Sequence, residues 1–265
     1  MPRRASDYLS RRPQLLKEFD QTVKHIQPVL GRYFTLEQVP VLIQETRQEY
    51  SGIIPQLPDL GGKQPFTQFI ISTGMLLAVY RVAKAYGKSI EEIGELIYEI
   101  GGAYLKAYPA FLMRLFGKMN FSQFYLRRLQ KRALESHRRQ YPGDYVYNFV
   151  AGDGQHFDYG VDYLECASCK FLAKQNASEL APYLCAVDIL YSRLLGWGLT
   201  RTMTLAQGAE KCDFRFKHGG PTNVAVPAAL LPVINRNGGL LVENLPLVSR
   251  LQSCCSNRYL MWRPR

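Results

Sequence analysis

A chain of 265 residues, of which 47% are hydrophobic and 21% charged, can bury a sizeable core, so intrinsic disorder is not expected. The net charge of +11 suits an anionic partner, but no helix-turn-helix, RNP-type or finger pattern accompanies it, so no specific nucleic acid is expected. The most apolar run, residues 69–80, falls short of the roughly 20 residues of a membrane span, and no secretory signal opens the chain. We therefore expect a cytoplasmic protein.

Helical patterns dominate residues 1–140. Apolar residues recur at spacings of three and four between residues 15 and 30, which predicts one amphipathic helix. Thr35 and Ser89 each open a capping-box pattern, so helices should begin near residues 36 and 90. Pro109 and Gly117 interrupt the helical pattern. Further helices are expected at 66–86, 90–106 and 121–139.

The last of these helices is strongly basic. Clustered cations on a helix are most often simply exposed to solvent, so the pattern predicts a solvated helix face. An anionic partner or a membrane surface is the alternative. The cations are Arg127, Arg128, Lys131, Arg132, Arg138 and Arg139.

After residue 141 the pattern changes to alternation. Residues 145–151 and 157–163, joined through a turn at Gly152 to Gly154, predict a β-hairpin whose solvated face carries His156, Asp158 and Asp162. Helices are expected at 166–174 and 179–195, the second capped by Ser178, and short strands at 199–205 and 212–217.

The predicted fold is therefore α+β. It has a helical N-terminal half and a small antiparallel sheet with helices in a Cys-rich C-terminal half. The helical region 1–140 and the α+β region 141–217 should form one domain, followed by an appended irregular tail, 218–265.

Four cysteines are spaced as a possible ligand set. Cys166 and Cys169 form a C-x2-C pair, Cys185 follows after fifteen residues, and Cys212 after twenty-six more. A C-x2-C pair can place two thiolates on one metal ion, so the spacing favours zinc or an iron-sulfur cluster. Two alternatives stay open: the cysteines are buried core residues, or one is a catalytic or redox thiol.

Around these cysteines the chain resembles the L-2-amino-thiazoline-4-carboxylic acid hydrolase family. The resemblance rests on four segments in order: ECASCKFL from Glu165, ELAPYLCAVD from Glu179, LTRTMTLAQG from Leu199 and CDFRF from Cys212. It is sharpest over residues 159–217. It implies a hydrolase acting on the C–N bonds of a cyclic amidine, which opens a thiazoline-type small molecule to a carbamoyl-cysteine.

Such a reaction needs an activated water molecule, a polarised amidine carbon and a group that binds the substrate carboxylate. A thiolate-bound metal with one open position would supply the first two. Arg201 or Arg215 could hold the carboxylate, because a guanidinium matches it bidentately. Thr202 and Thr204, on one face of the expected strand, are further candidates for substrate contact.

Several side chains are candidates for the general base or its support. Asp188 lies three residues after Cys185, on one face of the expected helix. Glu165 and His156 are the other candidates for the base, and His156 should be exposed. Asp213 follows Cys212 and should support the site by pairing with an arginine.

Two other classes of function stay open. In a small-molecule sensor or binding module the cysteine site would be structural, and in an iron-sulfur redox protein it would carry electrons. Four cysteines on one zinc would also close the site and leave no position for water. The sequence does not fix the oligomeric state, and a homodimer remains an alternative.

Overall fold

All regular structure before residue 146 is helical in the part of the chain that the structure describes. The computed structural model describes residues 6–61 and 66–238. Its first helices are α1 (Ser6–Ser10), α2 (Arg12–Leu30), α3 (Gln38–Ile53), α4 (Thr67–Ala85), α5 (Ile90–Lys106), α6 (Ala110–Met119) and α7 (Gln123–Ser136). The predicted helical half is confirmed.

The predicted helix starts depend on local hydrogen bonds. Ser89 caps α5: its hydroxyl accepts from the Glu92 N–H at 3.3 Å, and the Glu92 carboxylate accepts from the Ser89 N–H at 2.9 Å. Thr35 and Gln38 exchange the same pair of bonds just before α3. Each box satisfies two backbone donors that a helix start leaves unpaired, which is why the sequence located both helices.

α6 lies where the sequence predicted an interruption. Pro109 is its N-cap residue, so the proline precedes the helix rather than breaking it. Gly117 sits inside α6, against the backbone of a later helix: a Cβ there would lie 1.8 Å from the Leu195 oxygen. The glycine therefore allows a close approach, and the expectation of a break was wrong.

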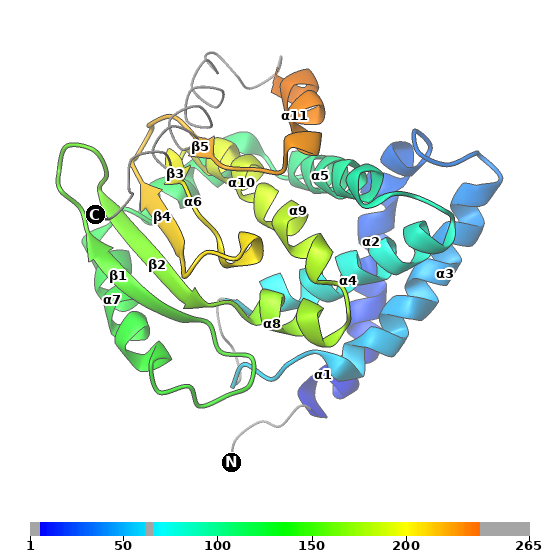
Figure 1. The fold of residues 1–265 in the computed structure, drawn as a ribbon, viewed down its shortest axis with the longest axis horizontal. Helices are drawn as coiled ribbons and strands as arrows, with labels where there is room; N and C mark the ends of the chain where they lie inside the picture. Colours follow the sequence, from blue (N-terminus) through cyan, green and yellow to red (C-terminus); the bar gives the residue numbers. More distant parts are fainter. Residues whose placement is uncertain (1–5, 62–65, 239–265) are drawn as a thin grey trace, which may run out of the picture.

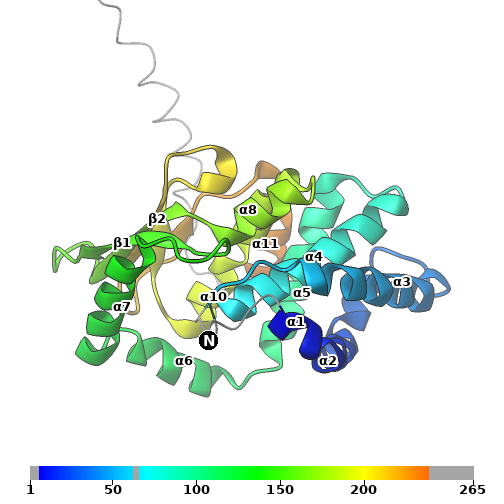
Figure 2. The ribbon, with the colours of Figure 1, turned by 90° about the horizontal axis from the view of Figure 1, so that it is seen from below.

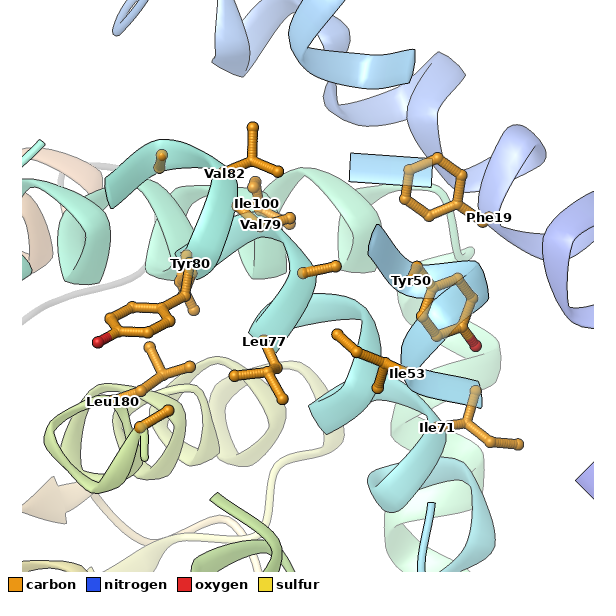
Figure 3. Packing of buried hydrophobic residues seen from close by; sticks show 14 of the residues in the cluster. Phe19, Tyr50, Ile53, Ile71, Leu77, Val79, Tyr80, Val82, Ile100 and Leu180 are labelled. Carbon is orange, nitrogen blue, oxygen red and sulfur yellow. The ribbon is translucent and has the colours of Figure 1, made fainter. Parts of the chain in front are cut away.

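The main core lies among α2, α3, α4 and α5. α4 is largely buried, as expected for a helix with an apolar sequence on most sides, and Leu77 is fully inaccessible. Figure 3 shows Leu77, Ile53 and Ile71 packed together, with Leu180 approaching from the C-terminal half. Removing a side chain such as Leu77 from a core of this kind costs about 2–5 kcal/mol. The two halves share this core, so neither is a separate packing unit.

A five-stranded mixed sheet follows, in the order β1-β2-β4-β3-β5. β1 and β2 form the predicted hairpin, β4 pairs antiparallel with both β2 and β3, and β5 is parallel to β3. Figure 1 shows the sheet on one side of the molecule with α7 beside β1, α2 and α3 on the other side, and α8 and α9 between them. The elements are β1 (Val146–Ala151), β2 (Tyr159–Glu165), α8 (Ala167–Lys174), α9 (Ala181–Ala186), α10 (Asp188–Leu195), β3 (Leu199–Arg201), β4 (Cys212–Phe216), β5 (Asn223–Val224) and α11 (Leu231–Gly238).

The expected solvated face of the hairpin is only partly solvated. Asp162 is 9% exposed, because β2 is an interior strand between β1 and β4. Its carboxylate accepts from Lys211 at 2.6 Å and from Arg215 at 2.7 Å. His156 is exposed, as expected. The alternation predicted the strand correctly, and the neighbouring strand β4 decided its burial.

The single helix expected at 179–195 is divided. A short 3-10 turn, Ser178–Leu180, precedes α9, and Ala177 rather than Ser178 is its N-cap residue. α9 and α10 meet at Val187, whose N–H donates to the Leu184 carbonyl at 3.2 Å, three residues back. This tighter bond ends one helix and starts the next.

Part of the predicted tail belongs to the fold. Residues 223–238 contain β5 and α11, and Leu230 and Val233 are fully buried beside the sheet and α5. The remaining residues, 239–265 with Cys254 and Cys255, lie outside the described residues. No helix of 6–61 and 66–238 is both long and apolar enough to cross a membrane.

Candidate functional site

The four spaced cysteines converge at the junction of α8, α9 and β4. Cys166 is the N-cap residue of α8, Cys169 lies in its first turn, Cys185 lies in α9 and Cys212 begins β4. All four are free thiols. The Cys169 thiol is hydrogen-bonded to Cys166. Cys185 and Cys212 lie close enough to Cys166 for an electrostatic interaction with it. Whether the four cysteines act as one ligand set stays a prediction.

Three of the thiols, Cys166, Cys185 and Cys212, are held in their neutral form by their surroundings. The hydrogen bond from Cys169, together with burial, raises the pKa of Cys166 well above its usual range. Burial raises the pKa of Cys185, and it raises the pKa of Cys212 to about 11. Thiols with such pKa values carry little negative charge at pH 7.

The donor set does not form a metal site in the part of the chain that the structure describes. No group of three or more Cys, His, Asp or Glu side chains there is arranged to hold one metal ion. We therefore derive no chemical step through a metal, and zinc or an iron-sulfur cluster stays a prediction.

Ser168, between the two cysteines of α8, ties the cluster to the rest of the protein. Its hydroxyl is 2.8 Å from the Tyr145 hydroxyl and 2.9 Å from the Thr73 hydroxyl of α4. The Tyr145 ring stacks on Phe66 with centroids 4.4 Å apart. Burial raises the pKa of Tyr145 well above its usual range, so this group acts as a neutral hydrogen-bonding phenol.

Asp188 and Arg201 form an ion pair beside the cysteines. Arg201 is 1% exposed, donates to the Asp188 carboxylate and, at 3.2 Å, to the Cys185 carbonyl. Its guanidinium lies 5.2 Å from the centroid of the Phe214 ring. Burial raises the pKa of Asp188, and Arg201 opposes that shift. The candidate base and the candidate carboxylate binder thus bind each other.

Asp213 supports a turn instead of an arginine. Its carboxylate accepts from the Thr202 and Met203 N–H groups, both at 2.8 Å, and from the Thr202 hydroxyl at 2.6 Å. The expected strand through residue 205 ends at Arg201, so Thr202 and Thr204 do not share a strand face. Thr204 is 1% exposed, and its hydroxyl accepts from the Gln207 N–H. The expected pairing of Asp213 with an arginine was wrong.

The remaining candidates have partners of their own. Arg215 donates to Asp162, on the sheet. Glu165 is paired with Lys170 and with Arg139, and these cations lower its pKa. His156 lies 2.7 Å from Asp153 in an exposed loop, apart from the cysteine cluster.

A pocket of about 140 Å³ opens next to Tyr145. Tyr141, Tyr145 and Tyr147 line one part of it, together with Phe66. Its charged lining consists of Arg132, Arg138, Glu135 and Asp144. Tyr163 lies near both Tyr145 and Asp188, and burial together with their proximity raises the pKa of Tyr163 above its usual range. The pocket is linked to the cysteine cluster through Tyr145, which lines the pocket and is hydrogen-bonded to Ser168, between Cys166 and Cys169.

A comparison with known families bears on this arrangement. The family model described as L-2-amino-thiazoline-4-carboxylic acid hydrolase matches residues 68–216, more than half of the chain. The chain belongs to this family. No curated protein and no solved structure matches it. The match begins in α4 and ends with β4, so it includes the whole cysteine cluster and the helices that pack on it.

Membership in this hydrolase family gives significance to residues that the sequence analysis missed. Tyr145, Ser168 and Thr73 lie within the matched range and link the pocket to the thiols. Only Ser168 had a signal in the sequence, its place inside the C-x2-C pair. The other two reach it from 23 and 95 residues away, a separation that no spacing pattern reveals.

Proposed function

We propose that this hydrolase opens the ring of a cyclic amidine, as in the conversion of 2-amino-thiazoline-4-carboxylate to a carbamoyl-cysteine. The family match across the cysteine cluster is the observation that carries the proposal. The pocket beside the cluster supports it, because its tyrosines suit a small flat ring. Its lining carries two arginines, which suit a carboxylate, together with Glu135 and Asp144.

The reaction adds one water to the ring. Water attacks the carbon between sulfur and nitrogen, and the resulting tetrahedral centre expels one of the ring atoms. If the C–N bond breaks, the ring nitrogen takes a proton and the product is an S-carbamoyl cysteine with a free amine. If the C–S bond breaks, the sulfur takes the proton and the product is an N-carbamoyl cysteine with a free thiol. We expect the C–N bond to break.

The substrate ring is placed in the pocket against Tyr145. In this arrangement the substrate carboxylate meets Arg132 or Arg138. Within residues 6–61 and 66–238 neither forms an ion pair, whereas Arg201 and Arg215 are each paired with an aspartate. The phenol of Tyr145, held by Ser168, is in position to donate a hydrogen bond to the ring.

Asp188 is our proposal for the general base. It is a partly buried carboxylate beside Cys185, and Arg201 fixes its orientation. Arg201 is then a positioning residue for Asp188. Glu165 has less support because it is paired with cations, and His156 has less support because it lies in an exposed loop.

The test is a ring-opening assay with the purified, metal-replete chain. Substrate loss is followed by mass spectrometry, and the product is treated with a thiol reagent and an amine reagent to identify the broken bond. We expect turnover that Tyr145→Phe and Arg132→Gln reduce and that the exposed control Asp153→Asn leaves unchanged. Absence of turnover with every thiazoline and related cyclic amidine would overturn the proposal. Binding without turnover would then favour the sensor alternative.

A further inference from the structure

The segment from residue 100 to residue 134 contains no acidic residue. It contains seven cations, and six of them have exposed side chains on α6, on α7 or at the end of α5. Lys131 is paired with Glu135 at 3.9 Å, and the other five make no ion pair with an acidic group of the described residues. The six exposed cations are Lys106, Arg114, Lys118, Arg127, Arg128 and Lys131. This surface therefore has a strong positive potential.

The same surface exposes large apolar side chains. Phe111, Leu115 and Met119 are 71%, 57% and 56% exposed, and their spacing of four places them on one side of α6. Phe116 and Phe124 are 54% and 70% exposed. Large apolar side chains gathered in one exposed patch mark an interaction site.

The inner side of α6 fixes which side faces out. Gly117 lies directly against the backbone of Leu195 in α10, and it is the buried residue of α6. The apolar side, opposite Gly117 around the helix, is thereby turned away from the protein. Figure 2 shows α6 along the lower edge of the molecule, followed by α7 at its end.

We propose that α6 and α7 form a docking surface for an anionic lipid bilayer. Helices that lie in the plane of a membrane surface combine an apolar side, which enters the headgroup boundary, with flanking Lys and Arg, which meet anionic headgroups. α6 has this composition: Phe111, Leu115 and Met119 would enter the boundary, with Arg114 and Lys118 beside them. The inference goes beyond the proposed hydrolase activity and does not depend on it.

The charges favour a bilayer over the two other occupants of this patch. A second copy in a two-fold dimer would bring the same cations against one another, at an electrostatic cost. The segment 239–265 carries four arginines and one glutamate, so its charge does not complement the surface either. An anionic bilayer complements both the cations and the apolar side chains.

Vesicle sedimentation tests the proposal with the full chain. The wild type should bind vesicles of phosphatidylcholine mixed with phosphatidylserine, bind phosphatidylcholine alone much more weakly, and dissociate as salt is raised. Lys118→Glu should weaken binding on the order of tenfold, since it removes one favourable charge and adds a repulsive one. Leu115→Glu should abolish binding at the same lipid concentration.

Matched variants outside α6 and α7 show whether a loss of vesicle binding is specific to this surface or follows from any added glutamate. Leu36, which is 86% exposed, is the control for Leu115, and Lys24, an exposed cation of α2, is the control for Lys118. Leu36→Glu and Lys24→Glu should bind as the wild type does, and circular dichroism should show all four variants folded. Equal binding of the Leu115→Glu and Leu36→Glu variants would overturn the proposal. So would a wild-type dimer in sedimentation velocity that Leu115→Glu converts to a monomer.

Discussion

Replacing Asp188 by asparagine removes the counter-charge of a guanidinium that has almost no access to water. Arg201 is 1% exposed, whereas the Asp188 side chain is 26% exposed. After Asp188→Asn, Arg201 keeps the Cys185 carbonyl at 3.2 Å and the Phe214 ring, but no carboxylate. A buried charge without its partner is strongly destabilising.

The expected loss follows from how buried each partner is. Breaking a buried ion pair by removing one partner costs about 3–5 kcal/mol, and the partial exposure of Asp188 lets water replace some of the lost interaction. We therefore expect the free energy of unfolding to fall by about 3 kcal/mol. Domains of this kind have stabilities of about 5–15 kcal/mol, so urea unfolding followed by circular dichroism will resolve the change.

The double variant Asp188→Asn with Arg201→Met is the control. Methionine removes the stranded charge and fills much of the same volume, so the double variant should be more stable than Asp188→Asn alone. A loss below about 1 kcal/mol for Asp188→Asn, or no recovery in the double variant, would refute this account of the pair. Turnover lost in the double variant although stability is recovered would support Asp188 as the base.

The other predictions use separate features. Gly117→Ala should lower stability by more than 2 kcal/mol, on the order of an overpacked contact, whereas Gly52→Ala, with nothing within 4 Å, should change it by less than about 1 kcal/mol; urea midpoints compare them. Burial raises the pKa of Asp162, but its two cationic partners outweigh burial and hold the pKa below its usual value. The resulting stability is present above the unfolded pKa of about 3.9 and is lost as the pH falls through the folded pKa; Asp162→Asn should flatten this loss in urea midpoints taken from pH 6 to pH 3. The described thiols do not form a metal site, so the metal hypothesis needs its own test: it predicts that protein purified without oxygen contains zinc, or iron with absorbance at about 400 nm, which Cys185→Ser loses, and background metal in the wild type would refute it.

Local signals in the sequence predicted most of the fold. Ser89 with Glu92 set the start of α5, and alternation set the β1–β2 hairpin. These features depend on interactions between residues close together in the chain, so a short stretch of sequence is enough to predict them. α6 was missed because Pro109 and Gly117 look like breakers when their surroundings are unknown.

The sequence predicted candidate site residues, but it did not predict how those residues pair. The cysteine spacing and the family resemblance located the four thiols, and the structure groups them around α8. The partners of Arg201, Arg215 and Asp213 depend on which strands and helices come together, so spacing gave no guide to them.

The sequence by itself determined the α+β class, the family and the set of thiols, because each follows from the order and spacing of residues along the chain. Only the tertiary structure decided three other features: the pairing of Asp188 with Arg201, the pocket beside Tyr145 and the outward apolar side of α6. Each depends on contacts between segments far apart in sequence. The contact of Gly117 with Leu195, for example, turns Phe111 and Leu115 toward the solvent.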